Sequence, residues 1–206
     1  AAQEAATQRY HLGFELVRLG QSARGYEIVE LARPALQELA ALTEDTVFAS
    51  IREGAEAVCV DRQVGAFPIR TLTLDVGDRR PLGVGAGSLA LLAALPEAER
   101  QEVVAANETR LANYPGFDRS ALLAFAAEAA LRGFALNEGR IVPGMCGVGV
   151  AIRDRHGTVY CALSAAAIKE RMGPDRIATV AGHLRVRADA LAVVLERRRA
   201  APREVA

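Results

Sequence analysis

The spacing of apolar residues predicts helices at both ends of the chain and strand pairs between them. Apolar residues recur at helical spacing over residues 12–23, and Gly25 ends this short helix. A longer apolar stripe over residues 26–42 predicts a second helix, which Pro34 kinks or starts afresh. The positions of this stripe are Ile28, Leu31, Ala32, Ala35, Leu36, Leu39 and Leu42.

Strand patterns occupy two separate parts of the chain. Two β-rich runs around Gly54 predict one hairpin, and two runs around the turn at residues 154–157 predict another. A further β-rich run predicts a third strand between them. The predicted strands are Thr46–Arg52, Ala57–Asp61, Ile69–Leu74, Cys146–Arg153 and Thr158–Ala166.

The remaining apolar patterns have helical periods. A short helix begins near Ala86, and two more cover Pro96–Ala106 and Asp118–Arg132, the latter with Asp118 as N-cap and Gly133 as its stop. A long helix begins at Pro174 and continues to the arginine-rich end. Its apolar positions are Ile177, Val180, Ala181, Leu184, Ala188, Leu191 and Leu195. Strands paired in hairpins, with helices around them, predict an α+β fold with an antiparallel sheet.

Composition narrows the classes of protein. The 25 basic and 25 acidic residues cancel, so the chain presents no broad positive field toward nucleic acid, and its 51% apolar content is sufficient for a sizeable core. Cys59, Cys146 and Cys161 are odd in number and far apart, which is typical of reduced thiols. The longest apolar runs are far shorter than the roughly 20 residues that span a bilayer, and no N-terminal signal pattern is present. We expect a cytoplasmic protein that binds no membrane.

The second hairpin has a predicted face of small residues. If its strands pair around residues 154–157, Gly147 lies opposite Ser164 and Gly149 opposite Ala162. A turn two residues shorter or longer changes these partners but not the faces, because the shift in register is even. The small-residue face holds Gly147, Gly149, Ala162, Ser164 and Ala166, and the other face holds Val148, Val150, Ile152, Val159, Cys161 and Leu163.

Two interpretations of this face remain open. Glycines on one face of a strand mark the close approach of a ligand, or of a helix that packs there. Ser164 orients a ligand or bonds to its own backbone. Residues 85–87, Gly-Ala-Gly, begin a predicted helix whose free N–H groups favour an anion such as a carboxylate. A glycine-rich turn that serves only backbone geometry is the commoner reason for such a sequence.

Other candidate sites have less support. His11, His156 and His183 are far apart, with no histidine or cysteine at ligand spacing, so we predict no metal site. Cys146 is a candidate nucleophile or, more commonly, a small buried apolar residue. The sequence contains neither a phosphate loop nor a dinucleotide fingerprint, and we predict no cofactor.

Several stretches, in their order and spacing, resemble the IclR family of bacterial transcription regulators. They are YHLG with the helix after it, VELARPALQELAALTEDTV, PLGVGAGSLALLAALPEAER, RGFALNEGRIVPGMCGVGVAIRDRHGTVYCALS and the final helix. The resemblance implies a GAF-like effector-binding domain, with a curved antiparallel sheet and flanking helices around a small-molecule pocket. It also implies homodimers or homotetramers that bind promoter DNA through an N-terminal winged helix. We expect residues 1–12 to be a remnant of that boundary, 13–25 a linker helix and 26–200 the effector-binding domain, with the winged helix missing.

The resemblance also implies which residues contact the effector. Carried over by position, they are Gly85, Ala86, Asn137, Gly147, Ser164 and Ala166. Family members that bind small keto acids have an acidic residue, a cysteine and two serines at the last four positions. Fewer polar partners here favour a larger or more apolar effector, such as an aromatic or aliphatic acid. The alternatives are a cysteine-dependent enzyme that uses Cys146 or Cys161, and a purely structural oligomerisation domain; we expect no enzyme.

Overall fold

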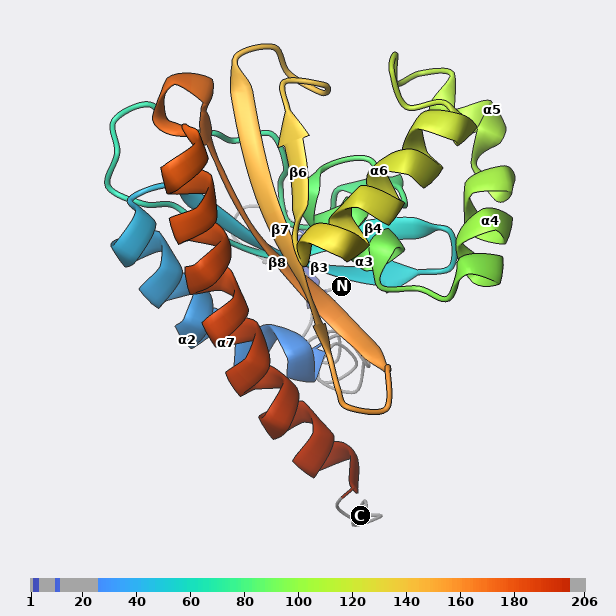
Figure 1. The fold of residues 1–206 in the computed structure, drawn as a ribbon. Helices are drawn as coiled ribbons and strands as arrows, with labels where there is room; N and C mark the ends of the chain where they lie inside the picture. Colours follow the sequence, from blue (N-terminus) through green and yellow to red (C-terminus); the bar gives the residue numbers. More distant parts are fainter. Residues whose placement is uncertain (1, 4–9, 12–25, 201–206) are drawn as a thin grey trace.

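A curved six-stranded antiparallel sheet is the centre of the computed structural model, which describes residues 2–3, 10–11 and 26–200 (Figure 1). Its strands lie in the spatial order β5-β4-β3-β8-β7-β6, and two short strands, β1 (Ala2–Gln3) and β2 (Tyr10–His11), pair separately. The sheet strands are β3 (Thr46–Glu53), β4 (Glu56–Gln63), β5 (Arg79–Pro81), β6 (Ala135–Glu138), β7 (Met145–Arg153) and β8 (Val159–Ile168). The predicted α+β class is confirmed, whereas the predicted helix over 12–23 lies outside the described residues.

The helices cover both faces of this sheet (Figure 1). They are α2 (Tyr26–Thr43), α3 (Ala86–Ala93), α4 (Glu97–Ala106), α5 (Glu108–Leu111), α6 (Arg119–Arg132), the 3-10 turn η1 (Lys169–Arg171) and α7 (Pro174–Ala200). Helices α2 and α7 pack on one face, and α3, with α4 and α6 behind it, packs on the other. Asp118 caps α6 by accepting a hydrogen bond from the Ala121 N–H, and Gly133 ends it at φ 78°, as predicted. None of the described helices is long and apolar enough to cross a membrane.

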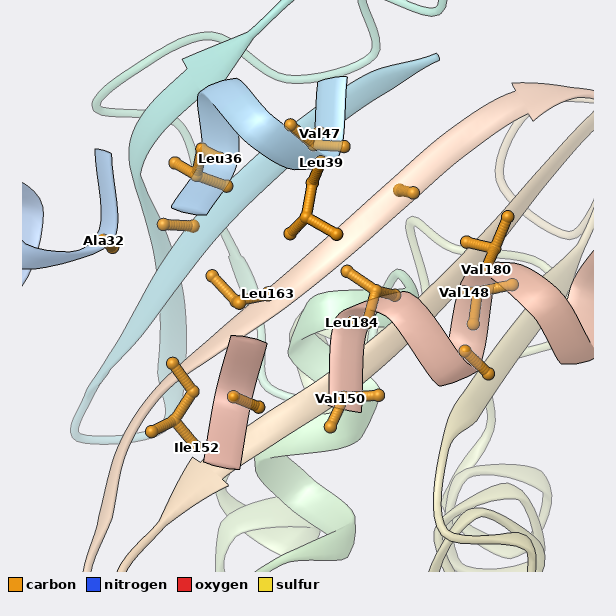
Figure 2. Packing of buried hydrophobic residues seen from close by; sticks show 14 of the residues in the cluster. Ala32, Leu36, Leu39, Val47, Val148, Val150, Ile152, Leu163, Val180 and Leu184 are labelled. Carbon is orange, nitrogen blue, oxygen red and sulfur yellow. The ribbon is translucent and has the colours of Figure 1, made fainter. Parts of the chain in front are cut away.

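The larger core lies between the sheet and helices α2 and α7 (Figure 2). Every predicted apolar position of α7, from Ile177 to Leu195, is buried there, and α2 contributes Leu36 and Leu39. The predicted stripe of α2 is wrong at its end, because Leu42 is 51% exposed. Helix α2 continues through Pro34 without a break. Alternation along β7 and β8 directs their larger apolar side chains into this core.

The register of the β7–β8 hairpin differs from the prediction by two residues. Gly147 pairs with Ala166 and Gly149 with Ser164. One residue of the difference comes from the turn, where the Asp154 N–H donates to the Thr158 carbonyl oxygen, and one from a bulge beside Ile152. The turn and the bulge each shift the register by one residue, so the total shift is even. The predicted faces therefore hold for all pairs on the far side of the bulge from the turn.

Two other predictions are corrected by the structure, and one strand was missed. Val159, which precedes the bulge, packs on the α3 face and not with Val148. The run Ile69–Leu74 forms no strand; the edge of β4 pairs instead with β5, and the backbone of Cys59 bonds to residues 77 and 78. Strand β6 was not predicted, because four residues that end in Asn-Glu give no clear alternation.

Helix α3 lies directly on the glycines of β7. A Cβ atom on Gly149 would lie 2.3 Å from the carbonyl oxygen of Ala86 and 2.9 Å from the Gly87 nitrogen. A Cβ atom on Gly147 would lie 3.2 Å from the Ala86 Cβ, which is tight but not prohibitive. Helix packing therefore explains Gly149, while Gly147 lies where that contact becomes looser.

We predict that Gly149→Ala lowers the free energy of unfolding by about 3 kcal/mol, because backbone atoms of α3 must move to admit the methyl group. Gly147→Ala is expected to cost less than about 1 kcal/mol, since a shift of a few tenths of an ångström at Ala86 relieves the contact. Denaturant unfolding followed by circular dichroism measures both.

Gly182→Ala is the matched control for this pair. Gly182 is exposed on α7 and an added Cβ meets no atom within 4 Å, so alanine should stabilise the helix by up to about 1 kcal/mol. Equal unfolding midpoints for Gly149→Ala and Gly182→Ala would show that α3 does not rest on Gly149.

Candidate functional site

A cavity of about 60 Å³ lies beside the first turn of α3, between the sheet and the segment that joins β4 to β5. The structure brings all six predicted effector-contacting residues to its wall: Gly85, Ala86, Asn137, Gly147, Ser164 and Ala166. Three of them form one row across the sheet, because Asn137 pairs with Gly147 and Gly147 with Ala166. Their role in effector binding stays a prediction.

The start of α3 forms one end of the cavity. Gly85 precedes the helix at φ 100°, a conformation that glycine adopts without strain. The N–H groups of Ala86 and Gly87 belong to the first turn and have no partner within the helix. The Ser88 hydroxyl is already used, since it accepts from the Gly83 N–H at 2.9 Å and donates to the Pro81 carbonyl oxygen. Backbone amides are therefore the donors that this end offers to a ligand.

Two serine hydroxyls lie beneath the same turn. A Cβ atom on Gly87 would lie 3.0 Å from the Ser164 Oγ and 3.6 Å from the Ser50 Oγ. Both serines are buried and line the cavity. Sequence reasoning missed Ser50, although an alternating face on β3 next to β8 would have indicated it, because Ser50 pairs with Ala162.

A segment without regular structure covers the cavity through Thr71, Thr73 and Leu74. Two guanidinium groups hold it: Arg62 donates to the Leu74 carbonyl oxygen at 2.8 Å and Arg80 to the Thr73 carbonyl oxygen at 2.5 Å. Thr71 is 1% exposed, although its neighbour Leu72 is 55% exposed. The run predicted as a strand is thus the cover of the cavity, and we call residues 69–76 the covering segment.

The covering segment is preceded by an anchor at the end of α2. The Phe67 N–H donates to the Glu44 carbonyl oxygen, and the Arg171 guanidinium lies 3.7 Å from the centre of the Phe67 ring. The same arginine bonds to the buried Asp45 carboxylate at 3.0 Å, and Arg176 bonds to it at 2.8 Å. The cover is therefore tied at this end to α2 and to the start of α7.

Two polar groups of the wall have unusual surroundings. The Oδ1 atom of Asn137 is buried and accepts no hydrogen bond within the described chain. Arg80, on the strand that the sequence did not predict, is half-buried and lines the cavity, and burial lowers the pKa of its guanidinium. Buried polar groups normally have partners, so the Asn137 Oδ1 atom and the remaining N–H groups of the Arg80 guanidinium suit a polar ligand.

The cysteines lack the environment of a nucleophile. Cys59 and Cys146 line the cavity, and Cys146 and Cys161 both belong to the larger core. Burial raises the pKa of Cys59 to about 11, with the nearby Asp78 carboxylate adding to the effect, and raises the pKa of Cys146 to about 11 and of Cys161 to about 12. His156 and His183 do not line the cavity, and the side chain of His11 lies outside the described part. Within the described residues no cluster of His, Cys, Asp and Glu is arranged to hold a metal ion.

We predict that the three thiols react slowly in the folded protein. At a pKa of about 11 roughly one thiol in three thousand is ionised at pH 7.5, and only the thiolate attacks. A disulfide reagent at pH 7.5 should modify the native protein at least about 100-fold more slowly than the protein unfolded in guanidinium. Rapid native labelling of one cysteine would contradict this environment.

Comparisons with known proteins identify the family of this chain. Residues 20–193 match the family described as "Bacterial transcriptional regulator IclR C-terminal". The HTH-type transcriptional repressor AllR of Klebsiella pneumoniae is 25% identical over 174 residues, which are 81% of this chain and 62% of AllR. The HTH-type transcriptional regulator Rv1719 of Mycobacterium tuberculosis is 31% identical over 152 residues, which are 74% of this chain and 58% of that protein. The chain thus spans about three fifths of the length of these relatives.

Solved structures share the fold. The Thermotoga maritima IclR superposes with a TM-score of 0.80 at 22% identity, over 94% of this chain and 78% of that one. The Agobacterium tumefaciens repressor BlcR superposes with a TM-score of 0.70 at 25% identity, over 93% of this chain and 76% of that one. Because the relatives are transcription regulators, an enzyme is not indicated. The chain belongs to the IclR family of bacterial transcriptional regulators and corresponds to the C-terminal domain of that family.

Proposed function

We propose that this domain senses a compact organic acid in the cavity beside α3. The carboxylate lies at the first-turn amides of Ala86 and Gly87, and the Ser164 hydroxyl and the Asn137 amide orient the rest of the molecule. The observation that carries the proposal is that backbone donors, serine hydroxyls and an unpartnered amide oxygen all border one covered cavity. Such a combination of apolar wall and few polar groups is typical of a small-molecule site.

The volume of the cavity favours a compact ligand over an aromatic one. A dry cavity of about 150 Å³ is sufficient for benzene, and this cavity is about 60 Å³. An aromatic acid therefore requires a larger displacement of the covering segment than a short aliphatic acid does. The volume therefore favours the aliphatic alternative over the aromatic one, and it goes against the larger effector expected from the sequence.

The sensor role extends to the whole regulator. The relatives are named HTH-type regulators and are longer than this chain, which supports a partner DNA-binding domain N-terminal to residue 26. On this proposal the domain forms homodimers or homotetramers in the bacterial cytoplasm, and the effector changes promoter binding through the placement of the subunits. Such control requires that the effector bind two arrangements of the regulator with different affinity.

We predict that a screen of short aliphatic acids by thermal unfolding finds one that raises the midpoint of this domain by about 5 °C or more at 100 times its dissociation constant. Ser164→Ala should weaken the binding of that acid about tenfold in calorimetry, because a buried hydroxyl partner is lost.

Thr179→Ala is the matched control, since it also removes one hydroxyl, from the exposed face of α7. Unchanged affinity in Ser164→Ala would reject this pocket. If neither aliphatic nor aromatic acids bind the wild-type domain at millimolar concentration, the alternative of a purely structural oligomerisation domain gains support.

A further inference from the structure

Arg80 differs from the other arginines of β3, β4 and β5 because it forms no ion pair with any described residue. Those arginines do: Arg52 pairs with Glu99, Arg62 with Asp75, and Arg79 with Glu53 and Glu56. Within the described chain Arg80 forms no ion pair, and its one hydrogen bond uses Nη2 to reach the Thr73 carbonyl oxygen. The nearby Asp78 carboxylate attracts Arg80 but forms no ion pair with it, so an anion in direct contact with this half-buried cation would be favourable.

The free end of this guanidinium faces the start of α3. A Cβ atom on Gly85 would lie 3.6 Å from Arg80 Nη1, so this nitrogen lies against the turn that leads into the helix. The first-turn amides and the partial positive charge of the helix end lie at the same turn. Two independent positive features of the cavity wall therefore converge on one place. A carboxylate has two oxygens and can accept from both.

The acidic residue of the cavity wall, Asp78, lies near Arg80 without pairing with it. Asp78 lines the mouth of the cavity, but its side chain is exposed and its carboxylate accepts a hydrogen bond from the Asp75 N–H at 2.8 Å. It forms no ion pair with Arg80 in the described structure. Its charge instead disfavours a second negative group near the mouth, so a monoanion suits this cavity better than a dianion.

The amide of Asn137 favours a ligand that carries a hydroxyl group in addition to its negative charge. Its Oδ1 atom is buried on the wall of the same cavity and has no partner in the described chain. A hydroxyl group both donates and accepts, so it satisfies an amide whichever of the two amide atoms faces it. The cavity of about 60 Å³ is small, so the shortest hydroxycarboxylates need the least displacement of the covering segment. Glycolate and lactate have five and six non-hydrogen atoms.

We infer that Arg80 is the charge anchor of the cavity and that the effector is a short hydroxycarboxylate. Its carboxylate lies between Arg80 Nη1 and the first-turn amides of α3, and its hydroxyl bonds to the Asn137 amide. This inference rests on the proposed sensor function and adds the chemical class of the ligand and the residue that selects for negative charge.

Pairs of probe ligands test the class on the wild-type protein. Calorimetry should give lactate or glycolate an affinity at least tenfold higher than that of the neutral lactamide or glycolamide, because the amide lacks the charge that Arg80 attracts. Propionate, which lacks the hydroxyl of lactate, should bind about tenfold more weakly than lactate. Asn137→Leu should remove the difference between lactate and propionate.

Substitution of the arginine tests the anchor. Arg80→Met should weaken lactate binding by about 10- to 100-fold and leave lactamide within about threefold, so the charge preference disappears. Arg80→Lys should give a lactate affinity between those of the wild type and Arg80→Met, since lysine keeps the charge but lacks the planar guanidinium that can donate two hydrogen bonds to one carboxylate. Arg79→Met is the matched control: it removes the neighbouring guanidinium, which is exposed, does not line the cavity and is paired with glutamates. It should leave both affinities unchanged.

The outcomes separate the inference from the function on which it rests. If lactamide binds the wild type as tightly as lactate, or if Arg80→Met retains full lactate affinity, the charge anchor is overturned. A simultaneous loss of affinity in Ser164→Ala would then leave the sensor function standing. If no acid and no amide binds the wild type, both are overturned. Should Arg80→Met fail to fold, the role of Arg80 is still tested by the affinities of the wild type for lactate and lactamide and by the lactate affinity of Arg80→Lys.

Discussion

The site depends on the close approach of helix α3 to strand β7. At Gly149 the backbone of the helix occupies the space that a Cβ atom would need, so the contact fixes the first turn of α3 on the sheet. Two residues away, at Gly147, the separation is larger and the cavity begins. The two interpretations of the small-residue face are therefore complementary. One glycine admits the helix, and the next lies on the wall of the space that the helix leaves.

The faces of the strands could be predicted from the sequence because alternation has a period of two. The register could not be predicted, since it depends on a turn and a bulge. Of the residues that were assigned to a face, only Val159 lies between the turn and the bulge, and it changes face. The run Ile69–Leu74 has the composition of a strand, but its backbone has no strand beside it, because β5 takes the edge of β4. Two segments compete for the edge of β4, and the pattern of residues within either segment does not show which of them pairs with it. Arg80 was missed for the same reason, since it belongs to β5.

The six residues expected at the site came from family resemblance, and the structure gives a physical reason for their proximity. Strand pairing aligns Asn137, Gly147 and Ala166 in one row, and α3 crosses that row at Ala86. The covering segment contributes groups that neither the resemblance nor the strand pattern indicated, because its position depends on contacts of single side chains with backbone carbonyls.

The two ends of the cover are held by different kinds of contact. Near Phe67 it is tied to the cluster in which the buried Asp45 carboxylate binds two arginines, and breaking such a buried pair costs about 3–5 kcal/mol. At Thr73 and Leu74 it is held by one hydrogen bond each from Arg80 and Arg62, and a hydrogen bond to a charged group contributes about 1.5–3 kcal/mol. Opening at this end breaks these two bonds and leaves the Asp45 cluster intact. On the proposed assignment, a carboxylate at Arg80 Nη1 fixes the guanidinium that holds this end, so bound effector stabilises the closed cover. A gain of that size shifts the equilibrium between open and closed covers about 10- to 100-fold.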